Sequence, residues 1–553
     1  MNLEALLSAR LGAAFSQVAG ATVDPAVRRS QHADFQSGAA LPLARRLGRP
    51  PRDLAAAALA VADLAGLATA EVSGPGFLNV TLADEWIAAG ANEVSGDPRL
   101  GVPRTRTPER VVVDYSAPNI AKELTIGHLR STVIGDAAAR VLEWLGHDVV
   151  RANHLGDWGT NFGMLIEHLV EAGTGPAGDL TAFYQAARHR FDTDDDFKTR
   201  ARLRVVALQG GDEPTLALWR RLVADSQGYL LAAYQRLGVT LTRADFTGES
   251  FYQEFLASVV DELAAKGLLT ESQGALCAFP AGFTGRAGEP LPLIVRKSDG
   301  GFGYAATDLA ALRYRVRDLG ATRLLYVVGS PQRVHFQMVY AVAAAAGWLP
   351  DGVTAEHVGF GSILGTDGKM FRSRSGEPVK LAAVLDEAVA RASALSPSAA
   401  IDGAVGIGAI KYADLSSDRM SDYVFDWDRM LALTGNTGPY LQYAHARVGS
   451  IFAKAGAVAA APVTIGAPAE RALALDLLAF EPVVTAAGET LEFHRLAGYL
   501  YGLASTFSTF YEKCPVLKAP VGVRESRLAL CDLTARTLRQ GLDLLGIAAP
   551  EQM

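Results

Sequence analysis

The clearest pattern of apolar and polar positions lies between residues 110 and 154. Residues 110–116 read RVVVDYS, an apolar and β-branched run typical of a buried strand. After His128, apolar residues recur at the helical period until Gly146 ends the pattern. This stripe consists of Leu129, Val133, Ala137, Val141 and Leu145. A second strand-like run, DVVRANH, follows at residues 148–154. The order strand, helix, strand predicts a βαβ unit and hence a parallel sheet.

The patterns on either side of this unit divide the chain into three regions. Residues 1–105 predict a small α/β domain, with helices broken by two adjacent prolines and two short strands around a Ser-Gly-Pro-Gly turn. Residues 106–400 predict the parallel-sheet domain, with an insertion at about 165–290 that is mostly helical and then partly β. Residues 401–553 predict a helical domain. The expected fold class is therefore α/β.

Composition narrows the class of protein. The chain has 553 residues, of which 49% are hydrophobic and 20% charged, so two to four globular domains with real cores are expected. The net charge of -7 argues against nucleic-acid binding that is independent of sequence, but it is compatible with a local basic surface.

Cysteine usage and the N-terminus bear on the compartment. The three cysteines lie far apart and form no C-x-x-C pair, so neither a zinc ribbon nor a disulfide framework is expected. The N-terminal segment carries an early acid and lacks a basic region before an apolar core, which favours a helix of the mature protein over a signal peptide. No stretch is long and apolar enough for a membrane span. We therefore expect a cytoplasmic protein without a membrane partner.

The start of the predicted helix offers a site for phosphate. Backbone N–H groups and the helix dipole point at an anion there, and ligands bind at the carboxyl ends of parallel strands. Gly127 would let a ligand approach the backbone, and His128 would add a donor. A lone Gly-His pair, however, is more often an ordinary helix start with a surface histidine.

Several longer motifs occur together. The stretch DYSAPNIAKELTIGHLRSTVIGD, followed by NHLGDWGTNFGML, resembles the class I aminoacyl-tRNA synthetases, and specifically the arginyl-tRNA synthetases. The His-x-Gly-His signature of that family corresponds to residues 125–128, and its Lys-Met-Ser-Lys-Ser loop to residues 369–373. The segments TGPYLQYAHARVGSIFAKAG and FYEKCPVL resemble the anticodon-binding domain of the same family. The resemblance implies a Rossmann-like catalytic domain with an insertion, an N-terminal domain that touches tRNA, and a helical anticodon-binding domain.

The resemblance also implies an ATP site, with two departures from the family pattern. Thr125 stands where the first histidine of the signature usually lies, and Arg372 stands where the second lysine of the loop lies. Arginine keeps the charge in a planar form, and Lys122 is expected to compensate for the altered loop. The implied catalytic residues are Lys122, His128, Lys369 and Arg372. The implied ATP-binding residues are Thr125, Gly127, His128, Lys369, Met370 and Ser373.

The arginine site is expected to use carboxylates, because a planar guanidinium pairs best with a bidentate carboxylate. Asp114 closes the first strand, and Tyr304 and Asp308 are four residues apart on one predicted helix face. The resemblance implies an arginine-binding set of Asp114, Asn119, Tyr304, Asp308 and Gln332. By spacing alone, Asp308 could instead be an acid that complements the helix dipole, and Tyr304 a packing aromatic.

The tRNA site is expected on the C-terminal domain. Tyr440, Tyr443 and Arg447 lie on one helical stripe, and aromatic and arginine planes suit unstacked bases. The resemblance implies that this face, together with Met553, forms part of the anticodon site. By spacing alone, half-buried packing with a solvated arginine is the favoured interpretation.

The expected reaction joins L-arginine to tRNA(Arg) at the expense of ATP, with Mg²⁺ accompanying the ATP. No protein-bound metal is expected, since the acidic stretch DTDDDFKTR lacks the EF-hand spacing and reads as a solvated helix start. We expect a monomer. Two other readings stay open from the sequence: a nucleotidylyltransferase of the same superfamily, and a non-catalytic synthetase-like binding protein.

Overall fold

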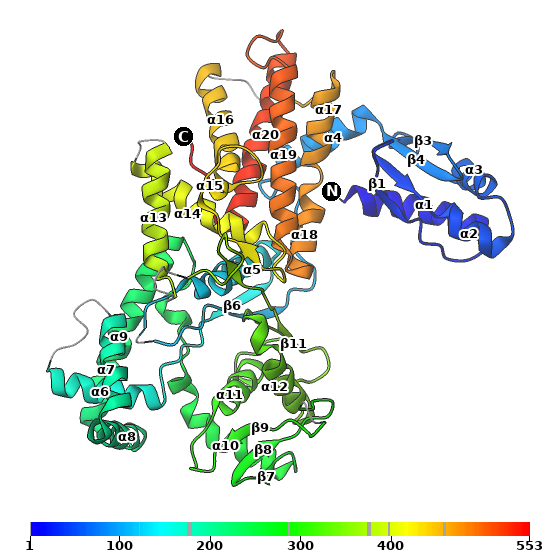
Figure 1. Cartoon of the computed structure of the whole chain (residues 1–553). Coiled ribbons are helices and arrows are strands. Elements are labelled where there is room, and N and C mark those ends of the chain that lie inside the picture. Colours follow the sequence, from blue (N-terminus) through cyan, green and yellow to red (C-terminus); the bar gives the residue numbers. More distant parts are fainter. Residues whose placement is uncertain are drawn as a thin grey trace.

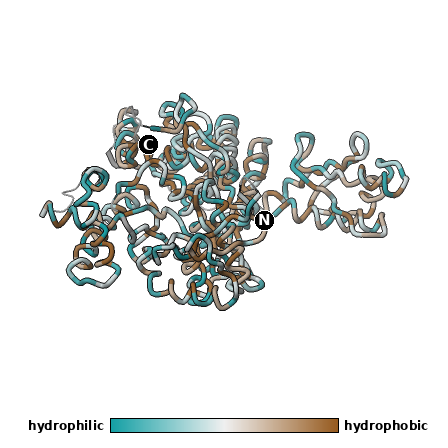
Figure 2. Tube along the Cα trace, turned by 60° about the horizontal axis from the view of Figure 1, so that its bottom comes forward, coloured by the Kyte–Doolittle hydropathy of each residue, from teal (hydrophilic) through white to brown (hydrophobic). Residues whose placement is uncertain are grey.

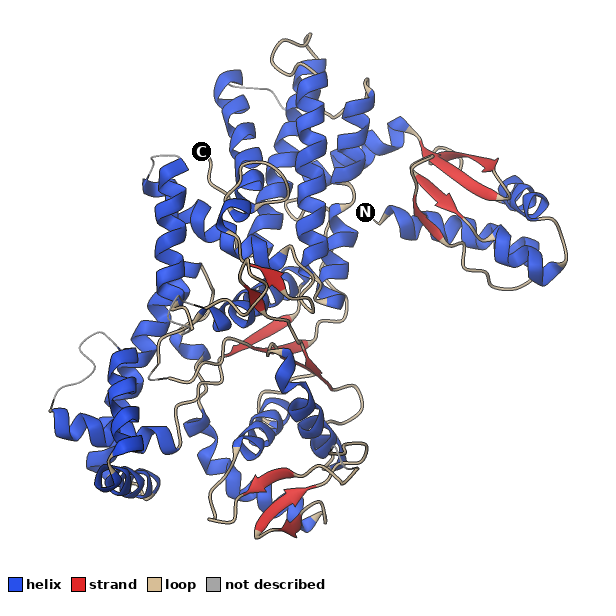
Figure 3. Cartoon of the chain, in the orientation of Figure 1, coloured by secondary structure: helices blue, strands red, loops and turns tan. Residues whose placement is uncertain are grey.

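The computed structural model describes residues 2–120, 122–173, 180–285, 288–372, 378–395, 399–456 and 461–553. Figure 1 shows an N-terminal domain that stands apart on one side, a central sheet, and a stack of long helices above it. Strands gather in the N-terminal domain, in the centre and in one small peripheral sheet, while helices make up most of the remainder (Figure 3). Apolar segments concentrate in the central body (Figure 2).

The N-terminal domain is an antiparallel sheet of strand order β1-β2-β4-β3 with helices packed beside it. Its elements are α1 (Leu3–Ala19), β1 (Val27–Arg29), β2 (Phe35–Ser37), α2 (Ala40–Leu47), α3 (Pro51–Val61), β3 (Ala68–Ser73) and β4 (Phe77–Leu82). The predicted proline break separates α2 from α3, and Pro51 is the first residue of α3, where its missing N–H costs nothing. Helix α4 (Asp84–Gly96) leads out toward the rest of the chain.

The central sheet is parallel, as the sequence predicts. Its strand order is β11-β10-β5-β6, with all three pairs parallel. The strands are β5 (Arg110–Asp114), β6 (Asp148–Ala152), β10 (Arg323–Tyr326) and β11 (Thr354–His357), and α5 (Leu129–Leu145) crosses from β5 to β6. Because the strands run in one direction, their carboxyl ends share one edge of the sheet.

The first strand ends two residues earlier than its apolar pattern suggests. Ser116 and Ala117 take positive φ angles of 70° and 43°, which turn the chain away from the sheet. The ring of Tyr115 then packs on Gly135 of α5, where an added Cβ would lie 2.2 Å from the Tyr115 Cβ. Glycine at this position therefore allows α5 to approach the end of the strand closely.

The insertion is helical first and β later, as predicted. Its helices are α6 (Thr160–Ala172), α7 (Leu180–Thr193), α8 (Asp195–Gln209), α9 (Glu213–Leu237) and α10 (Gln253–Ala265). A small antiparallel sheet follows, made of β7 (Thr270–Ser272), β8 (Ala275–Ala278) and β9 (Leu293–Arg296). The acidic stretch is a helix start, since the Asp194 carboxylate accepts from the Phe197 N–H at 2.9 Å. The chain returns to the sheet at β10 through α11 (Tyr304–Arg317), and α12 (Arg333–Ala345) then connects β10 to β11.

The remaining helices form the C-terminal stack. They are α13 (Leu381–Leu395), α14 (Ala399–Leu415), α15 (Trp427–Met430), α16 (Gly438–Ala455), α17 (Pro468–Leu477), α18 (Phe480–Thr490), α19 (Phe493–Lys513) and α20 (Val523–Leu544). Two short strands, β12 (Ile363–Leu364) before α13 and β13 (Tyr423–Val424) between α14 and α15, pair in parallel. In the described part of the chain, no helix combines the length and apolarity that crossing a membrane requires.

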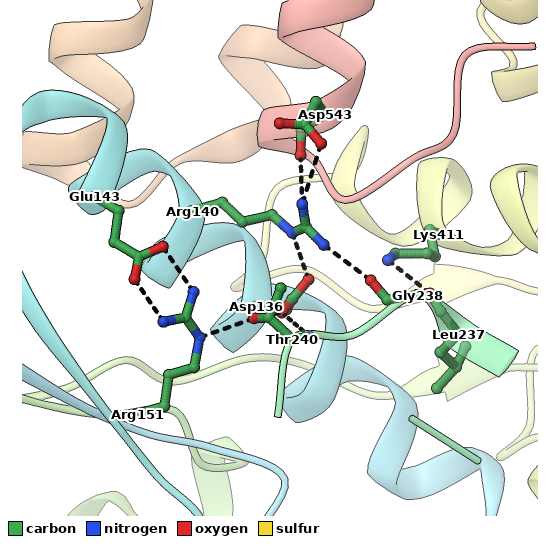
Figure 4. Close-up of polar contacts among 9 residues, drawn as sticks. All are labelled: Asp136, Arg140, Glu143, Arg151, Leu237, Gly238, Thr240, Lys411 and Asp543. Carbon is green, nitrogen blue, oxygen red and sulfur yellow. Dashed lines mark hydrogen bonds and ion pairs between the residues drawn. The ribbon is translucent and has the colours of Figure 1, made fainter. Parts of the chain in front are cut away.

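A buried polar network joins α5 to the insertion and to the C-terminal stack (Figure 4). Asp136 accepts from Thr240 and from Arg140, and Arg140 also reaches Asp543 of α20 at 3.2 Å. Lys411 of α14 donates to the carbonyl of Leu237 at 2.9 Å. Side chains from three distant segments, at Thr240, Lys411 and Asp543, thereby converge on the middle of α5.

Candidate active site

The signature at the head of α5 is built around one hydrogen-bonded cap. Residues Ile126–His128 form a 3₁₀ turn that runs directly into α5. The backbone N–H of Thr125 donates to His128 Nδ1 at 3.1 Å, and the Thr125 hydroxyl lies 3.1 Å from the same nitrogen. Thr125 therefore orients the imidazole. Its own contact with phosphate stays a prediction.

The cap also determines which nitrogen of His128 carries the proton. Because Nδ1 accepts from a backbone N–H, the proton of the neutral ring lies on Nε2. Burial lowers the pKa of His128, and the nearby Lys122 charge lowers it further. At neutral pH the ring is therefore a neutral donor that presents Nε2–H.

Gly127 leaves the backbone of the signature open. The residue is exposed, and among the described residues an added Cβ would meet only the Thr125 hydroxyl, at 3.6 Å. A phosphate can therefore approach the N–H groups at the start of the helix.

The lysine loop is attached to the signature by backbone hydrogen bonds. The Ile126 N–H donates to the Val379 carbonyl at 2.9 Å, and the Leu381 N–H donates to the Leu124 carbonyl at 2.8 Å. Lys380 also forms an ion pair with Glu123 at 2.5 Å. The segment that follows the loop thus lies beside the segment that precedes His128, although the two are far apart in sequence.

The loop itself begins as a tight turn. The Gly365 N–H donates to the Lys369 carbonyl at 2.7 Å, and Met370 bridges back to Leu364. Lys369, Met370 and Arg372 are exposed or half-exposed along this turn. The predicted ATP-binding Ser373 lies outside the described residues.

Lys122 lies near the signature and contacts the insertion. Its Nζ sits 4.1 Å from the centroid of the Tyr184 ring of α7, a cation–π contact with the insertion. The side chain is exposed. The insertion therefore holds the lysine that the sequence assigns to phosphate.

Asp114 lies at the carboxyl end of β5 in a buried ion pair. One carboxylate oxygen is 2.7 Å from Arg315 of α11, and both side chains are buried. Oδ1 of Asp114 has no hydrogen-bond partner among the described residues, and neither has the buried hydroxyl of Tyr326. Unpaired buried oxygens of this kind are costly, which makes this end of the sheet a candidate for a polar ligand.

A second carboxylate group lies nearby. Asp308 of α11 is 2.6 Å from His335 Nε2 of α12. Glu249 precedes α10, and burial raises its pKa to about 8, assisted by the charges of Asp157 and Asp308. Partly buried carboxylates that repel one another favour a cationic ligand. Glu249 was not predicted, because it belongs to none of the motifs in the sequence, whereas Asp157 lies within the motif NHLGDWGTNFGML without having been assigned a role.

The other predicted arginine contacts surround the same sheet edge. Asn119 bridges to Gly156 in the loop after β6, and Gln332 closes the turn after β10. Tyr304 is 71% exposed, so it is free of the packing role that its spacing allowed. Partial desolvation of its hydroxyl and the charge of Glu249 raise the pKa of Tyr304.

The predicted tRNA stripe on α16 divides into inward and outward residues. Tyr440 packs against Tyr501 with ring centroids 5.7 Å apart, and Arg447 stacks over the Tyr511 ring at 4.5 Å. Tyr443 is 44% exposed. Met553 packs on a small cluster that includes Ala392 and Leu431.

Models of known protein families match three parts of the chain. Residues 94–427 match the model described as "tRNA synthetases class I (R), catalytic domain". Residues 441–553 match the "DALR anticodon binding domain", and residues 1–82 the "Arginyl tRNA synthetase N terminal domain". The chain belongs to the class I arginyl-tRNA synthetases. The family resemblance seen in the sequence is thereby confirmed.

Relatives of this synthetase family agree over the full length. The arginine–tRNA ligase of Thermobifida fusca is 56% identical over 98% of this chain and 97% of its own. The solved arginyl-tRNA synthetase of Plasmodium falciparum superposes with a TM-score of 0.86 at 28% identity, covering 100% of this chain and 99% of its own. That of Thermus thermophilus gives 0.81 at 28% identity, with 100% of both chains covered. The predicted fold class of this synthetase is confirmed.

Proposed function

We propose that this enzyme joins L-arginine to tRNA(Arg) through an arginyl-adenylate. The observation that carries the proposal is that backbone hydrogen bonds join the segment after the lysine loop to the capped signature at His128. The group of carboxylates formed by Glu249, Asp157 and Asp308 supports it further. The arginine carboxylate attacks the α-phosphorus of ATP, the bond to the β-phosphate breaks, and pyrophosphate leaves. The 2′-hydroxyl of the terminal adenosine then attacks the arginyl carbonyl, and AMP leaves.

The phosphate side of the site works by positioning and charge. His128 donates Nε2–H to the phosphate, while Lys122, Lys369 and Arg372 balance the negative charge that grows on the leaving pyrophosphate. Thr125 orients the imidazole, and Gly127 opens the backbone. The exposed Met370 and the neighbouring Ser373 complete the ATP side by family resemblance.

The arginine side is acidic at its base. Asp308 and Glu249 pair with the guanidinium, and Tyr304 covers it. Asp114, Asn119 and Gln332 lie at the strand ends, where they hold the polar groups of the α-carbon. The raised pKa of Glu249 supports this assignment, because a cation between the carboxylates would relieve their repulsion.

The tRNA side extends over the C-terminal stack. The half-exposed Tyr443 offers its ring to an anticodon base. Arg447, whose guanidinium stacks on the Tyr511 ring, offers a second planar surface. Tyr440, which packs on Tyr501, and Met553, which packs on the cluster of Ala392 and Leu431, belong to the same proposed site by family resemblance. Residues 1–105 would contact the tRNA elbow, residues 106–400 the acceptor end, and residues 401–553 the anticodon.

Several finer points belong to the same proposal. Mg²⁺ enters with ATP and shields its phosphates, and among the described residues no cluster of His, Cys, Asp and Glu is arranged to hold a metal. We propose that the enzyme acts as a monomer. We place the enzyme in the cytoplasm, where tRNA is charged.

The direct test is aminoacylation of total tRNA with each of the twenty amino acids. Only arginine should be transferred. Turnover of ATP without any need for tRNA would favour a nucleotidylyltransferase, and ATP binding without turnover would favour a synthetase-like binding protein.

Substitution of Asp308 tests the arginine pocket. Asp308→Asn keeps the shape but removes the charged partner of the guanidinium, a loss of about 2–5 kcal/mol. The KM for arginine should rise by roughly tens-fold or more, whereas the KM for ATP should stay constant. Asp318→Asn, at the exposed end of the same helix, is the matched control. An unchanged arginine KM in a folded Asp308→Asn enzyme would remove Asp308 from the pocket.

A further inference from the structure

Arg130 is a buried charge that the reaction described above does not use. It is the second residue of α5, two positions after His128, and only 1% exposed. Its Nε lies 3.3 Å from the Asp414 carboxylate of α14, and its Nη1 donates to the Ser421 carbonyl at 2.9 Å. The guanidinium also faces the ring of Tyr423, with 5.3 Å to the centroid.

The partners of Arg130 belong to the base of the lysine loop. Tyr423 opens β13 and pairs with Ile363 of β12. The Tyr423 N–H donates to the Ser362 carbonyl at 3.1 Å, and the Ser362 N–H donates to Asp422 at 2.5 Å. Strand β12 ends at Leu364 and runs directly into the turn that carries Lys369.

The packing around this base leaves little freedom. An added Cβ on Gly361 would lie 2.7 Å from the backbone of Ser421, so the two segments are in close contact. On the other side of the loop, the Val379 carbonyl accepts from the N–H of Ile126. The first turn of α5 is therefore connected to both ends of the loop, by Arg130 at the entry and by the signature backbone at the exit.

The buried ion pair between Arg130 and Asp414 contributes more to the geometry of this region than to the stability of the fold. Two charges lose most of their hydration energy inside a protein, so a buried pair contributes little net stability compared with apolar residues of the same size. The planar fork of arginine, by contrast, fixes direction as well as distance. Lysine at position 130 would keep the charge but could not reach Asp414 and Ser421 from one rigid group.

We propose that Arg130 is a positioning residue for arginine activation, which sets the entry of the lysine loop relative to His128. This proposal rests on the ATP site assigned above. Arg130 touches no substrate. It acts through the loop, by keeping Lys369 and His128 at the separation that the phosphates of ATP require. A displacement of about 1 Å in such a group can cost about a hundredfold in rate.

The test measures pyrophosphate exchange, with tRNA(Arg) present, for Arg130→Lys in the full-length enzyme. We expect kcat to fall ten- to hundredfold, while the KM for arginine and the melting temperature stay near the wild-type values. Arg140→Lys is the matched control, because Arg140 lies further along the same helix and bonds to Asp136 and Asp543 instead. It should retain the wild-type kcat.

A double-mutant cycle separates positioning from a purely structural role. If Arg130 acts through the loop, Arg130→Lys should add little further loss in a Lys369→Ala background. Independent, multiplicative losses would overturn the proposal, as would a wild-type kcat in folded Arg130→Lys. If Lys369→Ala and His128→Ala both keep full activity, the ATP site itself has been misassigned, which is a different failure.

A second variant tests the same proposal in case Arg130→Lys folds poorly. Arg130→Met with Asp414→Leu replaces the buried pair by apolar side chains, a change that folded proteins tolerate well. This enzyme should melt near the wild-type temperature and still lose kcat ten- to hundredfold. A wild-type kcat would show that any packed pair suffices, and the positioning role would then be wrong.

Discussion

At the scale of single residues, the carboxylates of the proposed arginine site repel one another. Asp157 is buried and accepts from the Ser250 N–H at 2.8 Å and from its hydroxyl, which satisfies this carboxylate within the protein. Glu249 stands beside it with a pKa raised to about 8, chiefly by burial. A guanidinium placed between Glu249 and Asp308 would favour the ionised form of Glu249. Arginine binding should therefore release a proton.

The binding of arginine should strengthen as pH rises toward 8. Below the pKa of Glu249, the guanidinium must displace its proton, so the KM for arginine should fall by up to about tenfold per pH unit and then level off. Steady-state kinetics between pH 6.5 and 8.5 measure this, with the KM for ATP as an internal reference. Glu249→Gln should bind arginine weakly and with a flatter pH profile. The same slope in both enzymes would assign the titration to another group.

Lys122 should matter for chemistry and little for arginine binding. Removal of one preorganised donor to the transition state costs about 10²–10³-fold, so Lys122→Ala should lower the rate of pyrophosphate exchange in that range. Arginine and tRNA affinities should stay near wild type. Lys198→Ala is the matched control, since Lys198 also lies near an aromatic ring of the insertion, that of Phe191 at 5.7 Å. Nearly full exchange activity in Lys122→Ala would show that Lys122 is an ordinary surface lysine with no part in the reaction.

At the scale of elements, two buried contacts between oppositely charged side chains join α5 to α14. The cation of the first contact lies on α5, and that of the second lies on α14. Arg130 of α5 meets Asp414 of α14, and Asp136 of α5 lies near Lys411 of α14. A Cβ added to Gly546 would lie 2.7 Å from Lys411 Nζ and 3.0 Å from Asp136, so this short loop closes over both groups. Opposite charges along two packed helices disfavour a shift of one helix past the other.

The buried Lys411 should give the wild-type enzyme a characteristic pH dependence of stability. Burial lowers its pKa from 10.5 to about 8, so between these values the unfolded chain binds more protons than the folded one. The stability of the wild type, relative to Lys411→Met, should therefore rise with pH from about 8 to 10.5, by at most about 1.4 kcal/mol per unit. Melting temperatures of both proteins across this range provide the measurement. Parallel curves would mean that Lys411 is neutral or solvated throughout.

At the scale of the whole molecule, the N-terminal domain is held by a few polar contacts to the C-terminal stack. Arg471 of α17 makes a bidentate pair with Asp34, at 2.8 and 2.7 Å, and a further ion pair with Asp84 at 2.6 Å. Arg29 reaches the Leu475 carbonyl at 3.3 Å. These contacts lie where the N-terminal domain meets the body (Figure 1), beside further contacts of α4 such as Asn92 with Val463.

Loss of Arg471 should loosen the N-terminal domain while the active site stays intact. Arg471→Ala removes charged hydrogen bonds worth about 1.5–3 kcal/mol each, so limited proteolysis between residues 97 and 109 should accelerate by roughly tenfold or more. The radius of gyration from small-angle scattering should increase, whereas pyrophosphate exchange should keep its KM for ATP. Arg471→Lys, which keeps the charge without the fork, should behave in between. Unchanged cleavage and scattering would show that other contacts hold the domain.

The sequence by itself determined the local elements and the two motifs that we assign to the ATP site. The apolar stripe after His128 fixed α5 because helix periodicity is a property of neighbouring residues. The same holds for the parallel sheet, the helical insertion and the family. The end of the first strand was less predictable, because the positive φ at Ser116 accompanies the packing of Tyr115 on Gly135, a contact between different elements.

Only the tertiary structure decided which side chains meet. Arg130 and Asp414 are 284 positions apart, and no local pattern distinguishes either from a surface charge. Glu249 becomes unusual only where folding buries it near Asp157 and Asp308, and Lys411 only where the loop at Gly546 covers it. Desolvation and Coulomb interactions depend on distances in space rather than along the chain. For that reason the sequence predicted the motifs of the site, while the fold decided the charges that surround them.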